Sequence, residues 1–328
     1  MKRKAEAPKM TKQKHRESSD GHFVAPYEAS VSFDELPDSI PPSRYKPTWT
    51  GWVGITIFSF WVFIAIFGQY LAPIGENDLP FPDDYSEFQL PRAGAWLGTD
   101  VSDRDILSRL MFGAGRTIGI AFAATLLAYF IGVVFGIGAA ISTPRVDMIV
   151  SRVNDAFLSL PTIMLGLVVV AAVGSSIPVL IVTAGVIYAT VVFRLARALG
   201  QEIMVMDFVE AARVRGEGRW WIITREIWPN AAMPLMTDFG LRLIYVILFI
   251  SSLSFLGLGV QPPKADWGSM VRENLGALSY GASVIPVLAP ALAIATLTVA
   301  INLMSMTSRT QRWKIVKEDL IHDCRFRK

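Results

Sequence analysis

Six long apolar stretches separate the polar segments of the chain and determine its predicted architecture. Each stretch holds about 20 mostly apolar residues, the length that an α-helix needs to cross ~30 Å of hydrocarbon. Backbone N–H and C=O groups in lipid must be satisfied within the segment, so we expect six helices. They are predicted at residues 51–71, 117–141, 156–173, 177–195, 236–260 and 284–306. The fold class is therefore an all-α membrane protein with six transmembrane helices.

Composition agrees with this assignment and divides the chain into parts. Hydrophobic residues make up 52% of the 328 residues, and the mean hydropathy is +0.42, which is high for a soluble chain of this length. Residues 1–48 are polar and cannot bury enough apolar surface to fold alone, so we expect a disordered or extended tail. The first apolar run is too long and too far from the N-terminus for a cleaved signal peptide.

The predicted spans give four parts. Residues 1–48 form an N-terminal tail, and residues 49–116 hold the first span, an external loop and a helix at the outer interface. Residues 117–308 form the core of the remaining spans with a loop at 196–235, and residues 309–328 form a C-terminal tail.

Lysine and arginine are distributed unevenly about these spans. One side holds 24 of the 31 basic residues and the other holds 6, while Arg242 lies inside the fifth span. Cytoplasmic loops of membrane proteins carry the excess of Lys and Arg. Both termini and the loop 196–235 are therefore expected in the cytoplasm.

The loop between the fourth and fifth spans contains the most distinctive pattern, EAARVRGEGRWWIITREIWPN at residues 210–230. Its alanines favour a helix without bulk, and Gly216 can take a left-handed backbone and end that helix. A second, amphipathic piece around Trp220 and Trp228 is expected at the membrane face, before Pro229 restarts the chain into the next span. The residues alone leave open that this loop merely links two spans.

The spacing of Glu-Ala-Ala, then Gly four residues later and Pro thirteen residues after that, resembles the EAA loop of importer-type ABC permeases. In that family the short helix of the loop docks in a groove of the ATPase subunit. The resemblance implies a docking turn formed by Glu210, Ala211, Ala212, Arg215 and Gly216. Behind this turn it places Ile227, Pro229 and Asn230. Trp228 departs from the family, which often has Leu there.

Three further stretches, at residues 96–116, 152–165 and 254–270, resemble the C-type permease of dipeptide and oligopeptide importers. The resemblance implies the type I ABC importer permease fold. Asp103 stands where the family commonly has Gly. The helix starting near Ile106 has apolar residues on one side, which suits a position at the outer interface.

The resemblance also implies a function and partners. The chain would be half of the pathway of an ATP-driven peptide importer in a bacterial inner membrane. Its partners would be a homologous B-type permease, two ATPase subunits that bind ATP and Mg²⁺, an extracytoplasmic substrate-binding protein and the lipid bilayer, with no nucleic acid. The alternatives are the same machinery for nickel, opines or another small solute, or a stand-alone secondary transporter or channel.

Charged and small residues in the spans add specific expectations. Asp238 and Arg242 are four residues apart, so they can pair on one helix face, either near the cytoplasmic interface or in the pathway. Gly132 and Gly136 permit a close helix contact. Four charged residues before the second span are expected to be interfacial anchors: Arg104, Asp105, Arg109 and Arg116.

Signals for enzymatic activity are absent from the sequence. There is no Gly-rich phosphate loop ending in Lys-Ser/Thr and no HExxH, and the three histidines lie outside the predicted spans and the loops between them. A single cysteine, Cys324, excludes a disulfide framework. We therefore expect no cofactor on this chain and ATP hydrolysis on a separate subunit.

Overall fold

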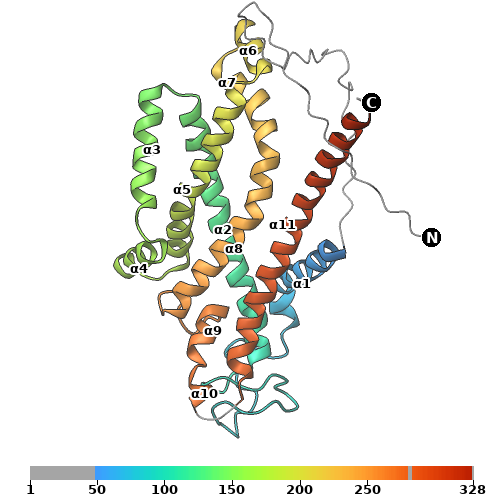
Figure 1. The fold of residues 1–328 in the computed structure, drawn as a ribbon. Helices are drawn as coiled ribbons and strands as arrows, with labels where there is room; N and C mark the ends of the chain where they lie inside the picture. Colours follow the sequence, from blue (N-terminus) through green and yellow to red (C-terminus); the bar gives the residue numbers. More distant parts are fainter. Residues whose placement is uncertain (1–48, 280–282, 327–328) are drawn as a thin grey trace, which may run out of the picture. The chain divides into compact units, whose positions relative to one another are not determined.

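The computed structural model describes residues 49–279 and 283–326, which are helical apart from their connecting loops (Figure 1). Within these residues the only extended pairings are two isolated bridges in the external loop. The predicted N-terminal tail 1–48 lies outside the described residues. The elements in chain order are α1 (Trp49–Leu71), α2 (Ile106–Ala140), α3 (Pro144–Leu158), α4 (Thr162–Val173), α5 (Ile177–Met204), α6 (Asp207–Val214), α7 (Arg219–Trp221), the π-helix η2 (Ile222–Ile227), α8 (Trp228–Phe255), α9 (Trp267–Glu273), α10 (Gly276–Ser279) and α11 (Ile285–Phe326).

Five segments of the described chain are long and apolar enough to cross a membrane. They contain α1, α2, α5, α8 and the part of α11 up to Ser305, and they correspond to five of the six predicted spans. The sixth is formed only if α3 and α4 together count as one span. The prediction of an all-α membrane protein is therefore confirmed, with one span of unexpected form.

The predicted third span, at residues 156–173, is not a straight helix. Helix α3 ends at Leu158, α4 begins at Thr162, and the two are bent by 85°. Pro161 directly precedes α4 and has no N–H to continue the helical ladder, and it also disfavours the helical region for the residue before it. The apolar pattern predicts a span here, but it does not predict the bend.

The predicted interfacial helix and the second span are one continuous helix, α2, of 35 residues. Asp105 caps its start, because the carboxylate accepts the N–H of Ser108 at 2.8 Å. Two glycines that could have interrupted the helix are covered by neighbours. Gly113 faces the Trp267 ring, and Gly115 faces the carbonyl of Ala65.

The core is built on the contact between α2 and α5. A Cβ added at Gly132 would lie 2.6 Å from the Cβ of Val192, and one added at Gly136 would lie 2.7 Å from the carbonyl oxygen of Phe193. The predicted close contact through these glycines is therefore confirmed. One apolar cluster includes residues of α2, α5, α8, α9 and α11. A second lies toward the loop after α5 and includes Ile203, Val209, Ile222, Ile227 and Leu235.

The C-terminal helix extends further than the apolar pattern predicts. The sixth span is expected to end near residue 306, but α11 continues to Phe326. The predicted tail at 309–328 is thus helical as far as Phe326.

Candidate functional site

Helix α6 and the turn after it form a compact unit at the position of the predicted docking turn. Gly216 has φ +83°, which is the left-handed conformation that glycine adopts without strain. The N–H of Gly216 donates to the carbonyl of Arg213 at 2.9 Å, and the N–H of Glu217 donates to that of Ala212 at 3.1 Å. These two bonds are the Schellman arrangement that ends a helix. The local sequence therefore dictates a sharp end to α6.

The predicted second amphipathic piece is not separate from the fifth span. Helices α7, η2 and α8 form a continuous helical segment, Arg219–Phe255. The expectation that Pro229 restarts the chain is wrong. Pro229 lies in the first turn of α8, where its missing N–H is tolerated, and the π-helix leads directly into it. The N–H of Trp228 accordingly bonds to the carbonyl of Ile223, five residues back.

The predicted coupling residues fall into a buried set and an exposed set. Val209 and Ala212 on α6 are fully buried, and Val209 belongs to the apolar cluster that contains Ile227 of the helix that leads into α8. The remaining predicted residues are exposed: Glu210, Ala211, Arg215, Gly216, Pro229 and Asn230. Asn230 is also tied to the helix, because its amide donates to the carbonyl of Glu226 at 2.6 Å. The turn is therefore held from behind and presents a free outer surface.

That outer surface also carries apolar side chains. Val205, Val214 and Trp220 are strongly exposed around α6, although α6 belongs to a charged loop. Exposed apolar side chains next to charges are typical of a protein contact surface. The described part of this chain contains no element that covers them.

The predicted pair in the fifth span is formed. Arg242 Nε lies 2.9 Å from Asp238 Oδ2, and Arg242 Nη2 lies 3.2 Å from Asp238 Oδ1. Tyr129, on α2, donates its hydroxyl to the same carboxylate at 2.8 Å. The sequence does not predict this hydrogen bond from Tyr129, because only the fold brings α2 beside α8.

The sequence also does not predict a buried charge network beside the loop between α1 and α2. Arg109 and Asp100 are each about 1% exposed and lie 3.3 Å apart, and Arg104 and Glu273 join them. The expectation that Arg104, Asp105, Arg109 and Arg116 are interfacial anchors is thus wrong. Arg116 binds Glu76, and Asp105 caps α2. The network joins the external loop to α9, whose Trp267 donates to the carbonyl of Leu110 at 3.0 Å.

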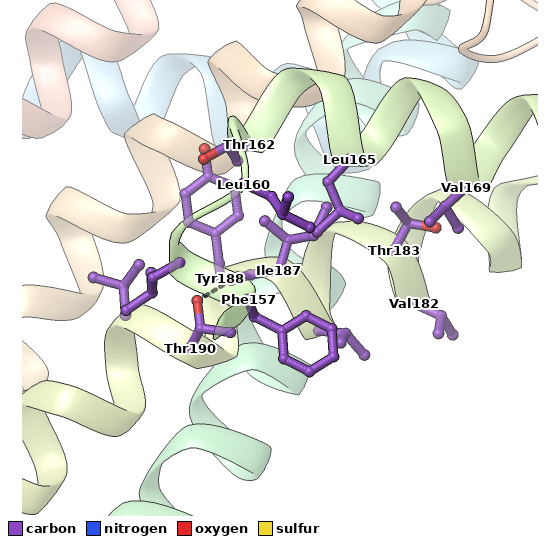
Figure 2. A pocket seen from close by; sticks show the side chains of 13 residues that line it. Phe157, Leu160, Thr162, Leu165, Val169, Val182, Thr183, Ile187, Tyr188 and Thr190 are labelled. Atoms are coloured by element: carbon purple, nitrogen blue, oxygen red, sulfur yellow. Dashed lines mark hydrogen bonds between the residues drawn. The ribbon is translucent and has the colours of Figure 1, made fainter. Parts of the chain in front are cut away.

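An apolar cavity lies where α3 and α4 bend around α5 (Figure 2). Its volume is about 220 Å³, and most of its lining side chains are apolar, with Thr162, Thr183, Tyr188 and Thr190 as the polar exceptions. Thr190 is internally satisfied, since its hydroxyl donates to the carbonyl of Ile187 at 2.6 Å. This cavity offers no charge to a polar solute.

Comparison with known families identifies the chain's relatives. The profile of the family described as "Binding-protein-dependent transport system inner membrane component" matches residues 132–308, which include α5, α6 and α8. The chain belongs to this family. It is therefore a multi-pass membrane permease subunit rather than a catalytic subunit, and membership implies a partner ATPase.

Curated relatives of this permease are named for peptide transport and related substrates. It is 31% identical over 241 residues to a glutathione transport system permease protein of Pectobacterium atrosepticum, covering 74% of this chain and 79% of the relative. It is 34% identical over 242 residues to a putative peptide transport system permease protein of Brucella suis biovar 1, with coverage of 74% and 81%. A nickel transport system permease protein of Escherichia coli K12 is 30% identical, with coverage of 69% and 80%.

Among solved structures, the permease resembles a chain of an inward-facing methionine ABC transporter. The TM-score is 0.49 at 18% identity, covering 61% of this chain and 95% of that chain.

Proposed function

We propose that this permease is one half of the translocation pathway of an ATP-driven peptide importer. It would pair with a homologous B-type permease in a bacterial inner membrane, with both termini in the cytoplasm. Two ATPase subunits that bind ATP and Mg²⁺ would sit below it, and an extracytoplasmic binding protein would deliver the peptide. Peptide transport is favoured because most of the relatives described above are named for peptides or glutathione, itself a peptide.

The observation that carries the coupling role is the build of α6. Its inner face is fully buried at Val209 and Ala212, so a force on α6 reaches the helix Arg219–Phe255 through packed side chains. Its outer face at Glu210 and Ala211 is exposed and small, so another protein surface can approach closely. ATP-driven movement of the ATPase would then shift the spans between inward-open and outward-open states.

The test is Ala211→Trp, which adds bulk to the exposed face of α6. We expect the variant to insert normally, to lose co-purification of the ATPase, and to lose peptide uptake in proteoliposomes containing the complete complex. Val134→Trp is the matched control, because Val134 is exposed on the apolar face of α2 and should tolerate the same ring. Wild-type ATPase binding and uptake by Ala211→Trp would contradict the coupling role.

Nickel is a second candidate substrate, because the nickel transport permease of Escherichia coli K12 is a relative at 30% identity. Direct uptake measurements distinguish the two substrates. Uptake of radiolabelled dialanine by the wild-type complex supports the peptide proposal, whereas uptake of ⁶³Ni²⁺ without dialanine uptake would replace it. Family membership argues against the alternative of a stand-alone secondary transporter.

A further inference from the structure

Helix α8 holds a complete ion pair well inside its membrane span. Both oxygens of Asp238 are engaged by Arg242, four residues later on the same helix. Arg242 lies thirteen residues before Phe255, the last residue of α8, which corresponds to roughly 20 Å along the helix. Taking Phe255 as the end of the span, the pair lies within the ~30 Å depth of the hydrocarbon core.

The pair is supported by α2 and remains partly open. Tyr129 donates to Asp238, and its ring packs on Phe239 at a centroid distance of 5.1 Å, so the carboxylate is fixed from the α2 side. The side chains of Arg242 and Asp238 are nevertheless 20% and 16% exposed. The guanidinium also lies 5.8 Å from the ring centroid of Tyr245, which is itself exposed. A route to the charges therefore exists along α8.

The surroundings indicate which medium this opening faces. The exposed positions of α2 are all apolar or glycine: Gly119, Phe122, Leu126, Phe130, Val134, Phe135 and Gly138. Such a face suits lipid. The opening on α8 also has apolar exposed neighbours, Met236 and Leu248, but it contains a carboxylate and a guanidinium. Charges exposed to hydrocarbon are costly, and charged residues within spans almost always face the interior of a bundle or a water-filled cavity. The opening therefore faces water or a polar solute rather than lipid.

Since buried ion pairs seldom repay the cost of removing both charges from water, stability alone does not account for this one. We propose that Arg242 and Asp238 form a binding site in the translocation pathway for a zwitterionic solute. Arg242 would bind a carboxylate, through the bidentate geometry that guanidinium groups favour, and Asp238 would bind an ammonium group. This inference rests on the proposed function, because a peptide with free ends carries both charges.

The arrangement suits passage rather than tight retention. Without solute the two side chains neutralise each other, and the site has no net charge. With solute, one internal ion pair is exchanged for two pairs to the solute, again without net charge. Tyr129 keeps Asp238 in place during the exchange, because its hydroxyl binds the carboxylate independently of Arg242.

The test measures dialanine uptake at a saturating concentration of binding protein, in proteoliposomes that contain the complete complex. Arg242→Gln should lower the maximal rate about tenfold or more, as expected for loss of a charged hydrogen bond. The decisive variant is the double neutral replacement D238N/R242Q. If the pair were only structural, removing both charges would restore uptake. As a binding site, the double variant should stay as slow as the single one, while insertion and ATPase co-purification remain normal.

A matched control uses an Asp–Arg pair elsewhere in the chain, which joins two helices. Arg197 on α5 binds Asp147 on α3 at 2.6 Å, so D147N/R197Q removes the same two residue types elsewhere. We expect it to retain uptake. Recovery of uptake in D238N/R242Q would overturn the binding site and leave the importer assignment intact. Failure of the wild-type complex to take up any peptide would instead overturn the proposed function itself.

Discussion

Arg109 and Asp100 form an ion pair in which the Arg109 Nε lies 3.3 Å from Asp100 Oδ2 and neither side chain reaches solvent. Asp100 also accepts from Arg104 Nε at 2.9 Å, and Arg109 also binds Glu273 at 3.3 Å. The pair therefore links the external loop, α2 and α9 in one network. Breaking a buried pair leaves an uncompensated charge, which is far more costly than losing an exposed pair.

Arg109→Met should lower the free energy of unfolding by about 3–5 kcal/mol, because the buried carboxylate of Asp100 and that of Glu273 each lose a charged partner. Arg92→Gln is the control, since Arg92 and Asp84 form a pair with 41% and 69% exposed side chains and should contribute about 0–1 kcal/mol. Thermal unfolding of the purified permease would measure both. Equal effects of the two variants would show that the network is not buried as described.

Asp103 is a site where the chain can be stabilised. It is fully buried with φ +58°, and its two carboxylate oxygens have no hydrogen-bond partner among the described residues. Asp103→Gly removes the unsatisfied carboxylate and relaxes the backbone, so we expect a gain of about 1–3 kcal/mol. Asp103→Ala keeps a Cβ in the left-handed region and should gain less. A lower melting temperature for the glycine variant would refute this account.

Glu76 should give the external loop an acid-sensitive attachment. Burial alone raises its pKa, but hydrogen bonds from Arg116 and from the N–H of Ala265 outweigh burial, so the pKa lies below the ordinary value of 4.5. A lowered pKa in the folded state stabilises the fold above the unfolded pKa, and this contribution is lost as the pH falls through the folded value.

We therefore expect limited proteolysis of residues 72–105 to increase as the pH is lowered below about 4.5, with an acid-stable protease as the probe. Glu76→Gln removes the titrating group, so its loop should be cut more readily at pH 7 and show less change on acidification. If wild type and variant had the same pH profile, Glu76 would not be the attachment.

The contact between α2 and α5 gives a matched pair of glycine variants. A Cβ at Gly136 would lie 2.7 Å from the carbonyl oxygen of Phe193, whereas a Cβ at Gly138 would meet nothing within 4 Å. Gly136→Ala should therefore destabilise the permease by about 1–3 kcal/mol through overpacking. Gly138→Ala should be neutral or stabilising by up to about 1 kcal/mol, because alanine favours the helix. Similar melting temperatures for the two variants would contradict the close contact.

The sequence predicts the membrane spans well, because apolar length is a local property. It also predicts the end of α6, since Gly216 is the residue type that a left-handed helix end requires. To predict the bend between α3 and α4, Pro161 must be given more weight than the apolar residues around it. The continuity of α2 depended on Trp267, which covers Gly113 from more than 150 residues away in the sequence.

Charges were the hardest part to assign from sequence. The buried Arg109 and the exposed Arg92 look the same in a linear sequence, because burial depends on which residues the fold brings near. The sequence predicts the Asp238–Arg242 pair because both residues lie on one helix, four residues apart. It does not predict the hydrogen bond from Tyr129, because Asp238 lies 109 residues further along the chain.

The π-helix at Ile222–Ile227 changes how the start of the helical segment Arg219–Phe255 is rotated relative to the rest of it. A π-turn takes up about one residue more than an α-turn, and one residue corresponds to roughly 100° of rotation about an α-helix axis. The side chain of Trp220 therefore points about a quarter-turn away from where an uninterrupted α-helix would place it relative to Arg242. Gain or loss of one residue in this π-helix would rotate the end of the segment at Trp220 relative to Arg242, without altering the residues of either surface.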